Sequence, residues 1–216
     1  MTASDLPRII ADVERGRFPA ADGSVSVVAP VNARDAGVLA FTAHAMVVAD
    51  VDAGWVAEQL RTVDLSAPLG PSFVLALATR IGRRIGSTDA VLLAEPLPYA
   101  ETSLVELGLD EIETSDHPRL RRALRHRDGV WMWTGGGAVL AIGRGVGGRY
   151  EVNVELDPAA RGRGLARALV HAARALVPDG RSLWAQVAPG NAASMRTFLD
   201  AGYRPVGAEV LLTGAG

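Results

Sequence analysis

The 216-residue chain has no cysteine and no lysine, and only 5% of its residues are aromatic. Without cysteine it can form no disulfide, no thiolate nucleophile and no cysteine-ligated metal site. All 22 basic residues are arginine, a bias that we attribute to GC-rich coding because alanine, glycine and valine are also abundant. No apolar run is long enough to cross a bilayer, and the N-terminal segment lacks the apolar core of a signal peptide. We therefore expect a cytoplasmic protein without a membrane partner.

The charge balance argues against a polyanion as partner. The formal net charge is −2, and the most basic segment, residues 118–127, follows an acidic one. A helix over this segment would carry several arginines, which suits either a solvated helix face or contact with phosphate. Because the overall charge is negative, we favour the solvated face and expect no nucleic-acid partner.

The most informative stretch covers residues 150–177, where a strand, a loop and a helix follow one another. From Tyr150 to Leu156 apolar and polar residues alternate, which predicts a strand with one buried face. Asp157-Pro158 ends this strand. From Leu165 onward apolar residues recur at helical spacing, which predicts an amphipathic helix.

The loop between them, RGRGLA at residues 161–166, has the composition of an anion site. Glycines at a strand-to-helix junction let the backbone approach a ligand closely, and the first N–H groups of the helix point outward with the positive end of the helix dipole. Such a site suits a phosphate or pyrophosphate. Arg161, Arg163 and Arg167 would add positive charge, although a glycine-rich turn without a ligand is the alternative.

A second motif follows at a fixed distance. A strand over 182–187 leads to PGNAAS at 189–194, a helix through Asp200, AGY at 201–203 and a last pair of strands. Before the first motif, residues 130–134 and 138–144 read as a hairpin of the same sheet.

Together the two motifs resemble the GNAT superfamily of N-acetyltransferases over roughly residues 110–216. Arg-x-x-Gly-x-Ala, placed between a strand and an amphipathic helix, is similar to the acyl-CoA pyrophosphate loop of that family. The resemblance implies an α/β (α+β) fold with a central, mixed, mostly antiparallel sheet flanked by helices. It also implies an enzyme that transfers an acetyl group from acetyl-CoA directly to an amine, without a metal.

In this family the acyl-CoA lies between two diverging strands, so the resemblance also implies its binding residues. The pantetheine would pair with the backbone of the first strand, the pyrophosphate would lie on the loop, and Asn191 would contact the cofactor. For Asn191, capping of the following helix is an equally good interpretation. The implied cofactor-binding residues are Val154, Glu155, Leu156, Arg161, Gly162, Arg163, Gly164, Leu165, Ala166, Arg167 and Asn191.

The sequence departs from the family pattern at two catalytic positions. Phe198 stands where many members have an acidic tyrosine, and Gln186 stands where some have a glutamate base. The remaining catalytic candidates are Glu151, Glu155, Ser194 and Tyr203. Either glutamate would act as base directly or through water, with a solvent-facing carboxylate as the alternative. Tyr203 stands at a position that is usually an aromatic core residue in the family, and core packing is its favoured role. Positioning of the reactants alone can also accelerate such a reaction.

Residues 1–109 carry no chemical motif, and we expect an α/β region that shapes or covers the acceptor site. The expected elements are strands over 24–31 and 89–95 and helices over about 32–48, 53–61 and 72–82, capped in the first two cases by Asn32 or Asp35 and by Asp52. His44 would lie on the first of these helices as a core or half-buried residue. A degenerate second acyltransferase-like half is an alternative origin for this region.

We thus expect two domains, 1–109 and 110–216, in a monomer or homodimer whose partners are acetyl-CoA and an unidentified amine. A non-catalytic acyl-CoA-binding regulatory module is the alternative function. Phe198 and Gln186 are the residues that favour it.

Overall fold

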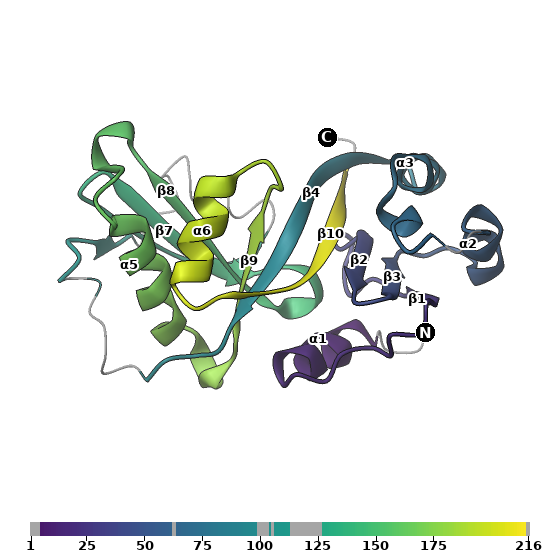
Figure 1. Ribbon diagram of the computed structural model, residues 1–216, viewed down its shortest axis with the longest axis horizontal. Helices are drawn as coiled ribbons and strands as arrows, with labels where there is room; N and C mark the ends of the chain where they lie inside the picture. Colours follow the sequence, from purple (N-terminus) through teal and green to yellow (C-terminus); the bar gives the residue numbers. More distant parts are fainter. Residues whose placement is uncertain (1–4, 62–63, 99–103, 105, 113–126, 215–216) are drawn as a thin grey trace. The chain divides into compact units, whose positions relative to one another are not determined.

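The structure, a computed structural model, describes residues 5–61, 64–98, 104, 106–112 and 127–214. The chain divides into two compact units, residues 1–91 with 206–216 and residues 92–205, whose elements are labelled in Figure 1. The sequence pattern placed a boundary near residue 110, whereas this division falls after residues 91 and 205. That the first unit is a degenerate acyltransferase half stays a prediction.

The first unit combines a small sheet with helices. Its elements are α1 (Leu6–Glu14), β1 (Val25–Val28), β2 (Gly37–Phe41), β3 (His44–Val48), α2 (Ala53–Gln59), α3 (Pro71–Arg80), most of β4 (Arg83–Ala94) and most of β10 (Arg204–Gly214). β1 runs parallel to β3, and β2 is antiparallel to both β3 and β10. Val56 of α2 and Leu77 of α3 share a buried cluster with Val47 of β3. Helices α2 and α3 therefore cover one face of these strands.

Helix α2 begins where the sequence predicts it. The Asp52 carboxylate accepts a hydrogen bond from the backbone N–H of Trp55 at 2.9 Å, which satisfies one of the donors that the first helical turn leaves without a partner. The helix over 72–82 and the strand over 89–95 are likewise confirmed as α3 and β4, the strand being longer than predicted.

The predicted helix over 32–48 is wrong, because this segment forms strands β2 and β3 around a turn. From Ala36 to Val48 only Thr42 and His44 are polar, so the sequence has no decisive period there. Pairing of β2 with β3 and β10 selects the extended form. His44 accordingly begins a strand, where its side chain is largely buried.

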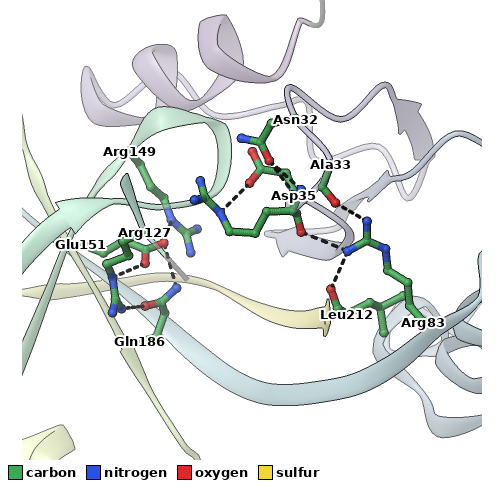
Figure 2. Close-up of polar contacts among 10 residues, drawn as sticks. Asn32, Ala33, Asp35, Arg83, Arg127, Arg149, Glu151, Gln186 and Leu212 are labelled. Carbon is green, nitrogen blue, oxygen red and sulfur yellow. Dashed lines mark hydrogen bonds and ion pairs between the residues drawn. The ribbon is translucent and has the colours of Figure 1, made fainter. Parts of the chain in front are cut away.

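Asn32 closes a turn instead of capping a helix. Its Oδ1 accepts hydrogen bonds from the N–H groups of Arg34 at 2.8 Å and Asp35 at 3.0 Å. An Asx turn and a helix N-cap use the same side-chain chemistry, so the residue type did not distinguish them. Figure 2 shows Arg83 donating to carbonyl groups of this turn and of Leu212, which joins the turn to β10.

Two other terminal elements differ from expectation. Helix α1, which the sequence interpretation missed, buries Leu6, Ile10 and Val13 along one side. The expected last pair of strands is the single strand β10.

The basic segment predicted as a helix lies outside the described residues except for Arg127. Within the described part of the chain, no helix combines the length and apolar character needed to span a membrane.

The second unit contains the expected mixed, mostly antiparallel sheet with helices packed on it. Its elements are β5 (Asp110–Glu111), β6 (Asp128–Gly135), β7 (Ala138–Arg144), β8 (Tyr150–Leu156), α5 (Leu165–Ala172), β9 (Leu183–Val187) and α6 (Ala192–Asp200). Short 3-10 turns lie at Ala67–Leu69 in the first unit and at Val146–Gly148, Pro158–Ala160, Ala173–Ala175 and Pro178–Gly180 in the second. These strands follow the order β9-β8-β7-β6-β5. Among the described residues of these five strands, β8 and β9 form the one parallel pair, and the other neighbouring pairs are antiparallel.

Helices α5 and α6 cover one face of this sheet. Leu169 of α5 and Phe198 of α6 belong to the same buried cluster as Ile142 and Val152 of the strands. Because side chains alternate along a strand, Glu151, Asn153 and Glu155 point to the other face.

Strands β8 and β9 pair over a very short distance. The register contains only Tyr150↔Leu183 and Glu151↔Trp184, whereas β8 pairs with β7 through to Leu156↔Ala138. In the described residues, no part of β9 pairs with β8 beyond Glu151. One edge of β8 is therefore open over its second half.

Gly202 and Arg174 together fix the backbone where α6 ends. Arg174 donates to the carbonyl oxygen of Glu95 from Nε at 2.9 Å and to that of Ala201 from Nη1 at 2.9 Å. Gly202 has a φ of +86°, and a Cβ added to it would lie 2.7 Å from Nη1 of Arg174.

We predict that Gly202→Ala lowers the free energy of unfolding by about 1–2 kcal/mol, because a left-handed backbone strains an alanine and the arginine must move. Gly190→Ala is the matched control, since an added Cβ there has no atom within 4 Å and the backbone is not left-handed. Urea denaturation measures both. Equal stability of the two variants would contradict the prediction.

Candidate functional site

A cavity of about 920 Å³ lies in the second unit between the end of β8, the loop before α5 and the start of α6. Its lining residues come from these three places in turn: Val154, Glu155, Leu156, Asp157 and Pro158; Arg161, Gly162, Gly164, Leu165, Ala166 and Arg167; and Asn191, Ala193, Ser194, Thr197, Phe198 and Asp200. The cavity begins three residues beyond the last β8 residue that pairs with β9. It thus joins the open strand edge to the glycine-rich loop.

The loop needs glycine for its backbone conformation. Gly162 and Gly164 both have a φ of +76°, and neither has an atom within 4 Å of an added Cβ. Gly164 is the N-cap of α5, and its carbonyl accepts the N–H of Ala168 at 3.1 Å. The N–H groups of residues 165–167 precede the first such intrahelical bond, so they have no carbonyl partner within the helix. This helix start opens on the cavity and suits an anion.

Side-chain charges around the loop are mixed. Arg161 lines the cavity and donates from Nε to the Leu156 carbonyl at 3.2 Å, and Arg167 lines it as an exposed side chain. Among the described residues, Arg167 has no carboxylate partner in an ion pair. Asp157 and Asp200 also line the cavity and offset part of this positive charge.

Asn191 is the N-cap of α6 and also lines the cavity. Its Oδ1 accepts the backbone N–H of Ser194 at 3.1 Å, which makes the capping interpretation correct. Capping fixes the start of α6, and it leaves the side chain at the cavity wall. A contact with a cofactor therefore stays a prediction.

The structure brings nearly all the cofactor-binding candidates together. All of them line the cavity except Arg163, an exposed residue of the same loop. Phe198, which the sequence analysis placed at a catalytic position, lines the cavity as well, whereas sequence reasoning missed Thr197 and Asp200. Their spacing from Asn191 and Ser194 places them on one side of α6, a signal that helical periodicity contains.

The four catalytic candidates separate into two pairs. Glu155 and Ser194 line the cavity, and both side chains are half-buried. Glu151 and Tyr203 are buried, and neither is among the residues that line the cavity.

Tyr203 has a packing role. Its hydroxyl donates to the Val170 carbonyl at 3.0 Å, and its ring packs edge-to-face on Phe198 with 4.9 Å between centroids. Burial raises the pKa of this tyrosine well above its ordinary value, against a smaller opposing effect of Arg174. A buried, hydrogen-bonded phenol that does not reach the cavity is no proton donor for it, so the packing interpretation replaces the catalytic one.

Glu151 is only 3% exposed and has its two oxygens occupied (Figure 2). Oε1 accepts from Arg149 Nε at 2.8 Å and from Gln186 Nε2 at 2.9 Å, and Oε2 accepts from Arg127 Nε at 2.9 Å. Burial opposes ionisation, but the charges of Arg149 and Arg127 outweigh it and hold the pKa of Glu151 below its ordinary 4.5.

These contacts make Glu151 a poor general base. A buried carboxylate that has a lowered pKa, accepts three hydrogen bonds and does not line the cavity does not match the requirements of proton abstraction. The sequence contained part of the signal, since Arg149 lies two residues earlier and hence on the same face. Arg127 and Gln186 reach Glu151 only through the tertiary structure.

Comparison with known proteins gives one sequence match. Residues 98–203 match the model of the acetyltransferase (GNAT) family. No curated protein matches the sequence.

Similar solved structures include a protein from Novosphingobium aromaticivorans assigned to the GNAT family, with 20% identity over 62% of this chain and 68% of that one and a TM-score of 0.46. GCN5-related N-acetyltransferases from Kribbella flavida and Sphaerobacter thermophilus share 20% and 17% identity, with TM-scores of 0.40 and 0.37. These two matches cover 66% and 65% of this chain, and 64% and 55% of the respective structures. With TM-scores below 0.5, these likenesses add nothing to the functional argument.

We predict that Glu151→Gln removes a pH-dependent part of the stability. Because the folded-state pKa is lowered, the ionised carboxylate stabilises the fold fully above pH 4.5, and this contribution is lost as the pH falls through the folded pKa. The variant should be less stable than the unmodified protein by about 3 kcal/mol or more at pH 7, since it leaves buried arginines without their counter-charge.

This difference should shrink as the pH falls below 4.5. Urea denaturation at a series of pH values measures it, with Glu58→Gln, an exposed position on α2, as the control. A stability difference that does not vary with pH would show that the charge of Glu151 is not what stabilises the fold.

Proposed function

Because residues 98–203 match the model of the GNAT acetyltransferase family, we propose that this protein transfers an acetyl group from acetyl-CoA directly to an amine of an acceptor molecule. The observation that carries the proposal is one continuous cavity, which joins a left-handed glycine loop at a helix start to the part of the β8 edge that does not pair with β9. Its volume of about 920 Å³ suits a ligand of substantial size.

The loop would hold the pyrophosphate of the cofactor. The N–H groups at the start of α5 provide donors whose geometry is fixed by the helix, and Gly162 and Gly164 leave space beside them. Arg161 and Arg167 would add charge-assisted hydrogen bonds. Asn191 and Thr197 stand on the opposite wall, where they offer polar contacts to the rest of the cofactor.

The open edge of β8 would hold the pantetheine arm. Backbone groups of Val154, Glu155 and Leu156 lie at the cavity, on an edge that β9 does not cover. An extended chain with amide groups can pair with such an edge as an added strand does. This pairing would bring the thioester toward the place where β8 and β9 separate.

The reaction needs few groups from the protein. A neutral amine nitrogen attacks the thioester carbonyl, the carbon–sulfur bond breaks with its electron pair on sulfur, and the new ammonium loses one proton. Glu155 is the candidate to accept that proton directly or through water. The Ser194 hydroxyl is the candidate to donate a hydrogen bond to the departing thiolate, which takes its proton from solvent. Phe198, at the cavity wall, has no proton to give.

A second function is a binding module that holds acyl-CoA without transferring the acyl group. Phe198 at the cavity wall and the buried Tyr203 favour it, because neither supplies an acid to the thioester. Release of free CoA in the presence of a panel of amines distinguishes the two functions. Amine-dependent release supports the transferase.

We predict that Gly164→Trp weakens acetyl-CoA binding at least about tenfold, which corresponds to 1.4 kcal/mol, because the indole would occupy the pyrophosphate loop. Isothermal titration calorimetry measures the affinity. Gly180→Trp is the matched control, because Gly180 also has a left-handed backbone and an open surrounding but lies away from the cavity. Equal affinities of the two variants would exclude the loop as the binding site.

We predict that Glu155→Gln lowers kcat by about 100-fold while the affinity for acetyl-CoA stays nearly constant, because the side chain would act on the proton and its backbone on the cofactor. Tyr203→Phe should leave kcat nearly unchanged and cost about 1 kcal/mol of stability through its lost hydrogen bond. Steady-state kinetics with an amine found in the screen test both. A larger kcat loss for Tyr203→Phe would reverse these assignments.

A further inference from the structure

A network of hydrogen-bonded side chains crosses the sheet of the second unit on the face opposite α5 and α6. Arg127 lies just before β6, and its guanidinium reaches Glu151 on β8 and Gln186 on β9. Figure 2 shows the three side chains converging, with Arg149 on the other side of the carboxylate. The network therefore links residues that come from three separate parts of the chain.

Two glycines make room for this network. Gly143 of β7 is opposite Glu151 in the register, and a Cβ on it would lie 3.0 Å from Cβ and 3.2 Å from Cδ of Arg127. The arginine can cross β7 only because that side chain is missing. A Cβ on Gly145 would overlap the Glu151 carboxylate.

The network sits where the backbone pairing of β8 and β9 ends. Glu151 is in the last backbone pair, opposite Trp184, and Gln186 is two residues farther along β9. The amide of Gln186 donates to Glu151 Oε1 at 2.9 Å and accepts from Arg127 Nη2 at 3.1 Å. Side chains thus connect the two strands just beyond the point where their backbones separate.

The chemistry of the network makes this connection stiff. The Glu151 carboxylate and the Arg127 side chain are buried, 4% and 13% exposed, and hydrogen bonds to ionised groups are stronger and more directional than neutral ones. Gln186 uses both groups of its amide, because Nε2 donates to Glu151 and Oε1 accepts from Arg127. A glutamate there would lose the donor and place a second carboxylate beside Glu151.

We propose that Arg127, Glu151 and Gln186 form a brace that sets the separation of β8 and β9, and that this separation limits the length of the acyl group accepted beside the thioester. The second part rests on the proposed function, in which the thioester lies between these strands. Gln186 is then a positioning residue that determines acyl-chain selectivity.

The test removes the amide of Gln186 and measures binding of three probes, CoA, acetyl-CoA and hexanoyl-CoA, by calorimetry. Gln186→Ala deletes the side chain, and Gln186→Met keeps its length without the hydrogen bonds. Both leave the pairs of Glu151 with its arginines intact. Gln59→Ala, at an exposed position of the first unit, is the control.

We expect the unmodified protein and Gln59→Ala to prefer acetyl-CoA over hexanoyl-CoA by about tenfold. Both Gln186 variants should lose this preference, because a tenfold change in affinity corresponds to the energy of one or two hydrogen bonds. Affinity for CoA itself should change less than about threefold, because the loop that would hold the pyrophosphate is untouched. A merely structural role of Gln186 would weaken the binding of all three probes equally. An unchanged preference in Gln186→Met would overturn the role of Gln186 in acyl-chain selectivity.

Hydrogen exchange provides a readout that needs no ligand. Amides of residues 184–187 should exchange faster in both Gln186 variants than in the unmodified protein, because the brace holds this part of β9. If the unmodified protein bound none of the three probes, the proposed function would be wrong, and so would the proposed role of Gln186 in acyl-chain selectivity. Exchange would then still decide whether the brace exists, and unchanged rates would overturn it.

Discussion

The site depends on the early end of backbone pairing between β8 and β9. A backbone N–H or carbonyl that has no partner in its sheet must find one in water, in a side chain or in a ligand. β8 pairs with β7 along its whole length, so its other edge keeps its shape beyond the last residue that pairs with β9. The glycine loop follows this strand directly and brings the start of α5 to the same cavity. An anion site and an extended edge thereby become one continuous surface.

The two glutamates of β8 differ in role, one being structural and the other a candidate for the chemistry. Glu151 and Glu155 point to the same face, about 13 Å apart along the strand. Glu151 is buried between two arginines and serves as an electrostatic anchor, whereas Glu155 lies at the cavity. One residue type on one strand face thus has two different environments. The difference arises from Arg127, which reaches across β7 over Gly143.

The accuracy of the sequence-based interpretation depended on how local each signal was. Asp52 caps α2 and Asn191 caps α6 because a cap acts within four residues of chain. The strand β8 was equally clear, since alternation persisted through to Leu156. Residues 32–48 were misread as a helix for two reasons. Thr42 and His44 are the only polar residues from 36 to 48, which is too few to give a clear period, and Asn32 closes a turn with a helix-capping side chain.

The sequence by itself determined the chemistry of the loop. Its strand, its left-handed glycines and the helix after it are local properties, and the family resemblance of residues 98–203 follows from the same segments. Only the tertiary structure decided which of the two glutamates on β8 lies at the cavity, that Tyr203 belongs to the core, and that Gln186 meets Arg127 and Glu151. Those contacts join residues far apart in the chain. Strand register and helix packing set their distances, and no local periodicity encodes them.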